Sequence, residues 1–331
     1  MHFSLQEYLS DNPSLFQSPH AMIAEVCLTY LNFQCVRELS PTLTSAPPTV
    51  PLVGYASCYW GKHIRREKAE TVSPLALGLL IRFEQHISSR LLLLRHQEGR
   101  NRWVLGFYVR DPNGITGLHG AAFLGMVEIV VALLAMKEWD INATDNSMGR
   151  TALAWAAVRG HEDIVRILLQ CKDINPCTAD TDYGRTPLFL AAENGYEGVV
   201  KLLLEREDVN PNTADTVFGR TPLSWAAENG YEGIVKLLLE RDGINPDVPA
   251  VLSGETTSEL AAPREHTAIV ELFSARNPPF HSPWILTSNP PRPIRPTYLQ
   301  ALLNLSRLVV LQPNPFPPIP RPSSEWRLAP S

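Results

Sequence analysis

A repeat with a spacing of 35 residues is the feature that most constrains the fold of this chain. The segment that begins at Gly184 reads "GRTPLFLAAENGYEGVVKLLLE", and the segment that begins at Gly219 reads "GRTPLSWAAENGYEGIVKLLLE". Further copies of the pattern begin at Gly114, Gly149 and Gly254. Such self-similarity is typical of chains that stack copies of one small structural unit around a shared core.

Each copy predicts two helices and a projecting loop. Thr186 is a good N-cap, and Pro187 suits the first position of a helix. The small Ala191–Ala192 pair lies on the inner side of this short helix, and Gly195 ends it. The apolar residues of "YEGVVKLLLE" recur at helical spacing and predict a second helix. The following "DVNPNTAD" is rich in turn residues and predicts a loop.

These residues resemble the ankyrin repeat, whose pattern runs Gly-x-Thr-Pro-Leu-His-x-Ala-Ala. The resemblance covers roughly residues 111–276 and implies an all-α ankyrin-repeat solenoid of about five helix-turn-helix-loop units. The family histidine is kept only at His119. In the last unit Ser258 replaces the core leucine and Glu265 stands at the turn glycine. We interpret this degenerate unit as a terminal cap, with a decayed and partly unfolded unit as the alternative.

Residues 1–110 do not repeat and predict a helical region. One helix is expected within 18–33, with an apolar stripe formed by Ile23, Val26, Cys27, Tyr30 and Leu31. A second helix is expected within 50–67. The third, "SPLALGLLIRFEQHISSRLLLLRHQ", begins at Ser73 and is expected to be the longest helix of the region.

A second resemblance concerns the start of the chain. The segment "HFSLQEYLSDNPSLF" is similar to the helical segment that follows the NTPase module in fungal NACHT-type signal-transduction proteins. The matching residues are His2, Ser4, Glu7, Tyr8 and Leu9. The resemblance implies the sensor part of such a protein, either as a stand-alone product or as a truncated gene model. The sequence contains no Gly-x-x-x-x-Gly-Lys-Ser/Thr loop to hold nucleotide phosphates, so we expect no cofactor and no nucleotide hydrolysis.

Composition narrows the possible partners. The net charge of −5 argues against a nucleic-acid partner. The apolar run 75–81 is too short to span a membrane. An odd number of cysteines, without zinc spacing or a secretory signal, favours reduced thiols in a cytosolic or nuclear setting, and we expect a cytoplasmic location. Residues 277–331 hold 14 of the 29 prolines and therefore predict a Pro-rich disordered tail, which could alternatively be a ligand for proline-binding domains.

The sequence offers no catalytic or metal-binding pattern. His161-Glu162 lacks the second histidine of a metalloprotease motif because position 165 is Val. The loop acids Asp173, Asp180, Asp182, Asp208 and Asp215 lack the spacing of a calcium loop, and we interpret them as solvated turn residues. We therefore expect no catalytic residue, no metal and no cofactor.

The expected function is non-catalytic binding of a protein partner on the concave face of the repeats. Large aromatic and arginine side chains recur at the loop tips, where hot-spot residues would be useful. The candidate partner-binding residues are Tyr183, Arg185, Phe218, Arg220, Trp225, Arg150 and Arg159. Two alternatives stay open: Arg185 and Arg220 only pair with neighbouring loop acids, and Trp225 fills the core between repeats. The competing function is an enzyme or adaptor whose site lies in residues 1–110.

Overall fold

The computed structural model describes residues 18–41, 43, 45–66, 72–98, 114–136, 138–246, 256–261 and 266–276. All of the described residues belong to one compact unit, Met1–Phe280. In the described part of the chain every regular element is a helix, so the expected all-α class is confirmed. The motif at residues 2–9 and the Pro-rich tail lie outside the described residues.

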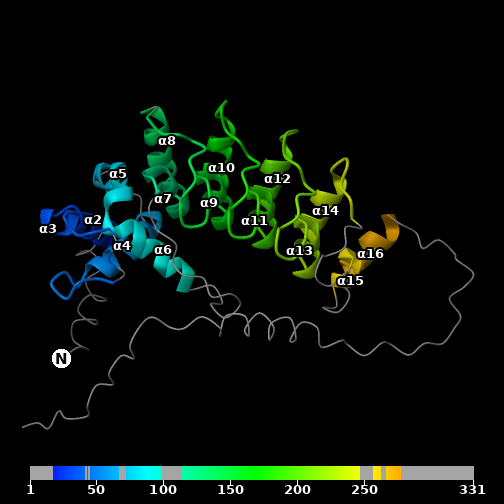
Figure 1. The fold of residues 1–331 in the computed structure, drawn as a ribbon, viewed down its shortest axis with the longest axis horizontal. Helices are drawn as coiled ribbons and strands as arrows, with labels where there is room; N and C mark the ends of the chain where they lie inside the picture. The colour runs from blue at the N-terminus through cyan, green and yellow to red at the C-terminus, as the bar shows by residue number, and fades with distance from the viewer. Residues whose placement is uncertain are drawn as a thin grey trace, which may run out of the picture. The chain divides into compact units, whose positions relative to one another are not determined.

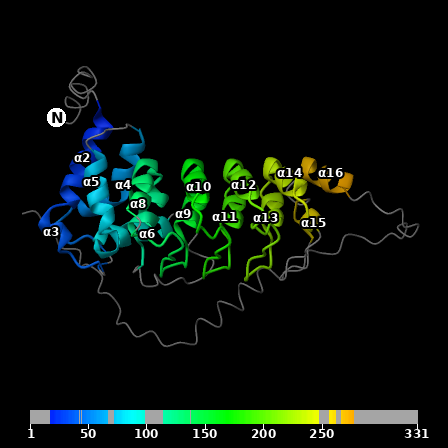
Figure 2. The same ribbon diagram turned by 90° about the horizontal axis from the view of Figure 1, so that it is seen from above.

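The repeats form five pairs of helices that stack in register. The first helix of each pair contacts the first helix of the next pair, and the second helices do the same, which gives two parallel rows (Figures 1 and 2). The stacking predicted from the 35-residue spacing is confirmed. The pairs are α7 (Gly117–Leu124) with α8 (Val127–Ala135), α9 (Ala152–Arg159) with α10 (Glu162–Leu169), α11 (Pro187–Glu193) with α12 (Glu197–Leu204), α13 (Pro222–Glu228) with α14 (Glu232–Glu240), and α15 (Thr257–Ala261) with α16 (Thr267–Arg276).

Local signals place these helices as the sequence predicts. The side chain of Thr186 accepts a hydrogen bond of 3.3 Å from the backbone N–H of Phe189 and so caps α11. Gly195 lies in the tight turn between the two helices of this pair. Its φ of 79° is a left-handed conformation, which is strained for any residue with a Cβ. A Cβ there would also lie 2.9 Å from the ring of Tyr231 in the next repeat. The turn glycine is therefore required both by its backbone and by its neighbour.

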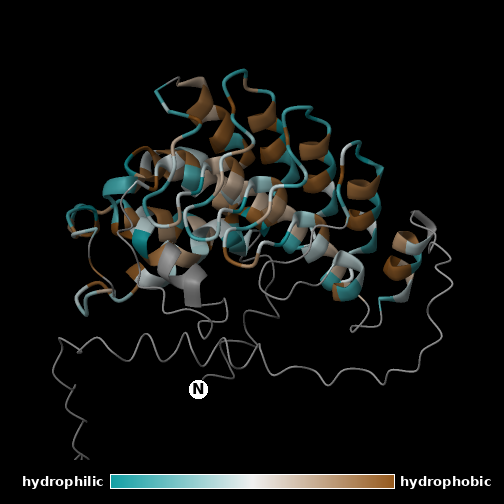
Figure 3. Ribbon diagram, turned by 45° about the vertical axis from the view of Figure 1, so that its right-hand side comes forward, coloured by the Kyte–Doolittle hydropathy of each residue, from teal (hydrophilic) through white to brown (hydrophobic). Residues whose placement is uncertain are grey.

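One hydrophobic core runs from the N-terminal helices through the stack. Trp60, Phe83, Trp155 and Leu188 all belong to it and are almost completely buried. Hydrophobic residues concentrate on the repeat helices, and hydrophilic residues concentrate in the projecting loops (Figure 3). Burial of this continuous apolar surface is the main favourable term that stabilises the stack.

The N-terminal region is a packed group of short helices. α2 (Pro19–Leu31) contacts α4 (Val53–Arg66) and α5 (Val72–Ile81), and α4 contacts α6 (Ile87–Glu98). The short α3 (Gln34–Arg37) follows α2, and the 3₁₀ turn η2 (Phe83–Gln85) separates α5 from α6. The expectation of one long helix from Ser73 is therefore wrong. The chain turns because Phe83 enters the core, only 1% exposed, and because His86 donates a 3.1 Å hydrogen bond to the carbonyl of Leu31.

The buried face of α2 also differs from the expected one. Ile23 and Val26 are 37% and 59% exposed, whereas Ala24, Leu28 and Leu31 are fully buried. Cys27 and Leu31 lie on the buried side as expected. Apolar residues surround most of this helix, so spacing alone does not select the face that packs. α2 therefore presents an exposed apolar stripe.

Two glycines let the N-terminal helices dock on the first repeat. A Cβ at Gly117 would lie 2.1 Å from the carbonyl oxygen of Leu80 in α5, and a Cβ at Gly120 would lie 2.7 Å from the ring of Phe83. α5 contacts both α7 and α8. Elements on the two sides of the expected boundary near residue 110 thus pack closely within one compact unit.

Candidate binding surface of the repeats

The projecting loops of neighbouring repeats are tied together through their backbones. The N–H of Thr181 donates a 2.8 Å hydrogen bond to the carbonyl of Met148, and the N–H of Thr216 donates a 2.7 Å bond to the carbonyl of Tyr183. These bonds satisfy backbone groups that a loop would otherwise leave to water. The loop tips that carry Tyr183 and Phe218 are therefore held in register with the helices behind them.

A buried aspartate organises each loop. Asp180 accepts hydrogen bonds of 3.0 and 3.1 Å from the backbone N–H groups of Tyr183 and Arg185. Asp145 and Asp215 occupy the equivalent positions, and the three side chains belong to residues that are 4% exposed or less. The interpretation of Asp180 and Asp215 as solvated turn residues is therefore wrong. Their carboxylates are buried because they replace the backbone partners that a tight loop lacks.

Two of the candidate arginines link one loop to the next. The guanidinium of Arg150 lies 3.1 Å from the carboxylate of Asp180, and that of Arg185 lies 3.6 Å from the carboxylate of Asp215. Arg185 also pairs with Glu193 at 2.9 Å. Arg150 and Arg185 are 2% and 5% exposed, so neither presents a free charge at the surface. The alternative in which Arg185 pairs with a neighbouring loop acid describes its geometry.

Aromatic rings enclose these arginines. The Arg185 guanidinium lies 4.3 Å from the ring centre of Tyr183 and 5.4 Å from that of Trp225. The Arg220 guanidinium lies 5.0 Å from Trp225 and 5.9 Å from Phe218, and Arg220 forms an ion pair with Glu228. Such stacking stabilises both the charge and the orientation of the ring. We call Tyr183, Arg185, Phe218, Arg220 and Trp225 the arginine–aromatic row.

The aromatic members of the row are only partly covered. Tyr183, Phe218 and Trp225 are half-buried, and burial raises the pKa of the Tyr183 hydroxyl above its ordinary value. The Trp225 indole donates a 3.2 Å hydrogen bond to Asp215. Trp155, at the matching position of an earlier repeat, is 1% exposed and donates a 2.9 Å bond to Asp145. Trp225 is therefore partly a packing residue and partly a surface residue.

The last two candidate residues lie closer to the first repeat. Arg159 is half-buried, and its guanidinium lies 4.7 Å from the ring centre of Phe123. Phe123 in turn makes an edge contact with Trp155 at 5.3 Å, and Arg150 lies 5.0 Å from Trp155. The seven candidates thus fall into two groups of contacts, one around Trp155 and one around Trp225.

Sequence reasoning missed the organising role of the aspartates. A signal was present, because an Asp precedes each tip glycine by four residues at Asp145, Asp180 and Asp215. In each case the side chain or the carbonyl of that Asp accepts a hydrogen bond from a backbone N–H group of the loop tip. Recurrence of a charged residue at the repeat spacing indicates a structural role.

Metal clusters, disulfides and membrane-spanning helices were sought among the described residues. Among them, no group of three His, Cys, Asp or Glu side chains is arranged to hold a metal ion. The five cysteines are all free thiols. None of the helices that the structure describes has both the length and the apolar character needed to cross a membrane.

Comparison with known families agrees with this geometry. Residues 86–180 and 172–250 each match the family model described as ankyrin repeats, three copies. The matches begin within the N-terminal helices and end before the fifth helix pair. A search of curated proteins found no match.

Proposed function

Since residues 86–180 and 172–250 match the family model of ankyrin repeats, we propose that the chain binds a protein partner across its second to fourth repeats. Ankyrin repeats generally mediate protein–protein interaction, and a stack of repeats offers one long surface for it. The observation that carries the proposal is the arginine–aromatic row. Half-buried Tyr183, Phe218 and Trp225 are held at the surface by stacked guanidinium groups.

Rigid aromatic anchors suit this role for a physical reason. Ordering a flexible side chain on binding costs free energy, and a ring that is already fixed avoids most of that cost. Tyr and Trp are also enriched among the residues that dominate binding energies. The row thus supplies anchors that need little rearrangement.

The candidate residues divide into two roles. Tyr183, Phe218, Trp225, Arg220 and Arg159 retain partial exposure and are proposed to contact the partner. Arg150 and Arg185 are buried and are proposed to position the rings and loops without direct contact. Because the charges of Arg185 and Arg220 are already paired with acids, the contact should be mainly aromatic and apolar. Its affinity should consequently depend weakly on salt.

The similarity of residues 2–9 to the post-NTPase segment of NACHT-type proteins supports a more specific role. In this proposal the repeats are the recognition part of a cytoplasmic signalling protein. The genomic sequence upstream of Met1 tests this part separately. A continuous reading frame with a phosphate-binding loop would support the truncated form of such a signalling protein, and a stop codon directly upstream in all transcripts would leave only the stand-alone form.

The binding proposal is tested by mapping the surface. A partner is first identified by chemical cross-linking and mass spectrometry, then expressed and purified. Hydrogen exchange of the 331-residue chain is measured with and without it. We expect slower exchange at the loop tips around 181–185 and 216–220. Protection confined to the N-terminal helices, with none at these tips, would move the binding site to that region.

A further inference from the structure

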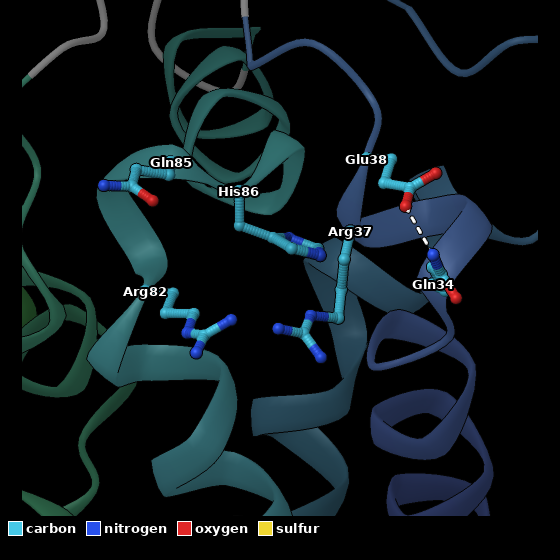
Figure 4. Close-up of a pocket in the computed structure, with 6 residues that line it drawn as sticks. All are labelled: Gln34, Arg37, Glu38, Arg82, Gln85 and His86. Carbon is cyan, nitrogen blue, oxygen red and sulfur yellow. Dashed lines mark hydrogen bonds between the residues drawn. The ribbon is translucent and has the colours of Figure 1, made fainter.

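A hollow lies outside the repeats, between the short helix α3 and the turn η2. Its volume is about 370 Å³, and its lining residues are Gln34, Arg37, Glu38, Arg82, Gln85 and His86. Figure 4 shows Arg37 and Arg82 extending toward each other from opposite walls. This volume is near the lower end of the range typical of small-molecule sites.

The fold holds the two walls together through buried hydrogen bonds. His86 donates a hydrogen bond of 3.1 Å to the carbonyl of Leu31 and accepts a hydrogen bond of 3.1 Å from the backbone N–H of Ser88. Because both ring nitrogens of His86 are engaged, the orientation of this buried lining residue is fixed. Burial lowers the pKa of His86, and nearby Arg37 lowers it further, so the ring is neutral at pH 7.

The charge in the cavity is unbalanced. Among the residues that the structure describes, no acidic side chain forms an ion pair with Arg37 or Arg82. Glu38 lies at the rim, where it accepts a 2.7 Å hydrogen bond from Gln34 (Figure 4). Two like charges that face one cavity repel each other, and an anion between them would reverse the sign of that interaction.

We propose that this cavity binds a small ligand that carries a phosphate monoester. A phosphate monoester carries a charge of about −1.5 to −2 at pH 7, which matches two guanidinium groups, whereas a single carboxylate carries only one charge. The planar donor fork of arginine fits phosphate oxygens in a bidentate manner. The cavity also has room for a small organic group beside the phosphate, with the Gln85 amide on its wall. This site is independent of the partner surface on the repeats.

The proposal is tested by isothermal titration of the full chain with glycerol 2-phosphate and with inorganic phosphate at low salt. We expect both to bind, with a Kd on the order of 1 mM or below for the monoester. Arg37→Gln and Arg82→Gln should each weaken binding by about ten-fold or more, because each removes a charge-assisted contact. Arg37→Lys and Arg82→Lys keep the charge but lose the fork, and should weaken binding less.

Two further variants make the test specific. Glu38→Gln removes a negative charge from the rim and should tighten binding by about two-fold or more. Arg166→Gln removes an exposed arginine from α10, far along the stack, and should leave the Kd unchanged. Melting temperatures of all variants show whether each is folded. Absence of binding to the wild type, equal binding of succinate, or equal affinities in Arg37→Gln and Arg166→Gln would overturn the proposal.

Discussion

The guanidinium of Arg150 lies 3.1 Å from the carboxylate of Asp180, thirty residues further along the chain and in the next projecting loop. Their side chains are 2% and 0% exposed. Both charges are therefore removed from water, and each depends on the other for compensation. This pair makes the geometry of one loop depend on the repeat that follows it.

Replacing Asp180 should strongly destabilise the stack. Asp180→Ala leaves the Arg150 charge buried without this partner and removes the acceptor for two loop N–H groups. Breaking a buried pair on one side costs about 3–5 kcal/mol. Urea unfolding followed by circular dichroism measures the free energy of unfolding. The control is Asp173→Ala at an exposed loop position, and an equal loss in both variants would contradict the structural role of Asp180.

Cys177 occupies a place where the equivalent residues are asparagines. The side chain of Asn142 donates a hydrogen bond of 2.6 Å to the carbonyl of Asp173 and accepts a hydrogen bond of 2.8 Å from the backbone N–H of Asn175. Asn212 forms the equivalent two bonds with Gly243 and Asn245. Cys177 makes only the first of these contacts, through a thiol 3.0 Å from the Asp208 carbonyl.

Cys177→Asn should therefore stabilise the protein. The new amide can donate to the Asp208 carbonyl and accept from the N–H of Asn210, for a gain of about 0.5–1.5 kcal/mol. Thermal and urea unfolding in a reducing buffer check this gain. Cys177→Ala, which supplies neither bond, is the matched control. A Cys177→Asn variant no more stable than Cys177→Ala would contradict the prediction.

His161 should make the protein less stable in mild acid. Burial lowers its pKa to about 4, opposed in part by its hydrogen bond to the Phe123 carbonyl. The unfolded state binds a proton near pH 6.5, whereas the folded state does so only near pH 4. The free energy of unfolding should fall as the pH drops through this window, by roughly 2–3 kcal/mol from this residue.

A substitution isolates the contribution of His161 from that of other histidines. The equivalent residues in the next two repeats are Tyr196 and Tyr231, so His161→Tyr is compatible with the position. Burial also lowers the pKa values of His86 and His119, so some acid sensitivity should remain. Urea unfolding at pH 7.5 and pH 5 compares the variant with the wild type. An identical pH dependence in both would show that His161 does not titrate as described.

Gly117 should be essential for docking of the N-terminal helices. Gly117→Ala places a Cβ 2.1 Å from the carbonyl of Leu80, so α5 or α7 must move. Ala152 occupies the matching position of the next repeat, so alanine itself suits the helix. We expect a loss of about 1–3 kcal/mol, typical of overpacking. Hydrogen exchange should be faster in α5 and unchanged in α13; an unaltered α5 with an unaltered melting temperature would contradict this.

The repeat helices were predictable because their signals are local. Thr186 and Gly195 mark the ends of a helix within one unit. Because the units recur every 35 residues, the same helix is predicted at the equivalent positions of the other copies. The expected helix over 73–97 failed because a long-range contact, His86 with Leu31, breaks it. The prediction of which face of α2 is buried was wrong because Val26 and Leu28 are both strongly apolar. Only their packing in the folded chain distinguishes the exposed residue from the buried one.

The sequence predicts which residues occupy the loop tips, but it does not predict how those residues contact one another. Aromatic and arginine residues at the tips of 183–185 and 218–220 are visible in the sequence. Their mutual stacking and the burial of Arg150 and Arg185 depend on how adjacent repeats meet, which no single unit encodes. The cavity between Arg37 and Arg82 likewise joins segments that are distant in sequence and carry no common motif.

The central claim, that the arginine–aromatic row binds a partner, is tested most directly by the affinity of the double variant Tyr183→Ala, Phe218→Ala. Isothermal titration with the identified partner should show a loss of about 2 kcal/mol or more, a weakening of roughly thirty-fold, with little change in melting temperature. Tyr55→Ala, at an exposed ring of α4, should bind like the wild type. Unchanged affinity in the double variant, with a folded protein and an intact partner, would contradict the account.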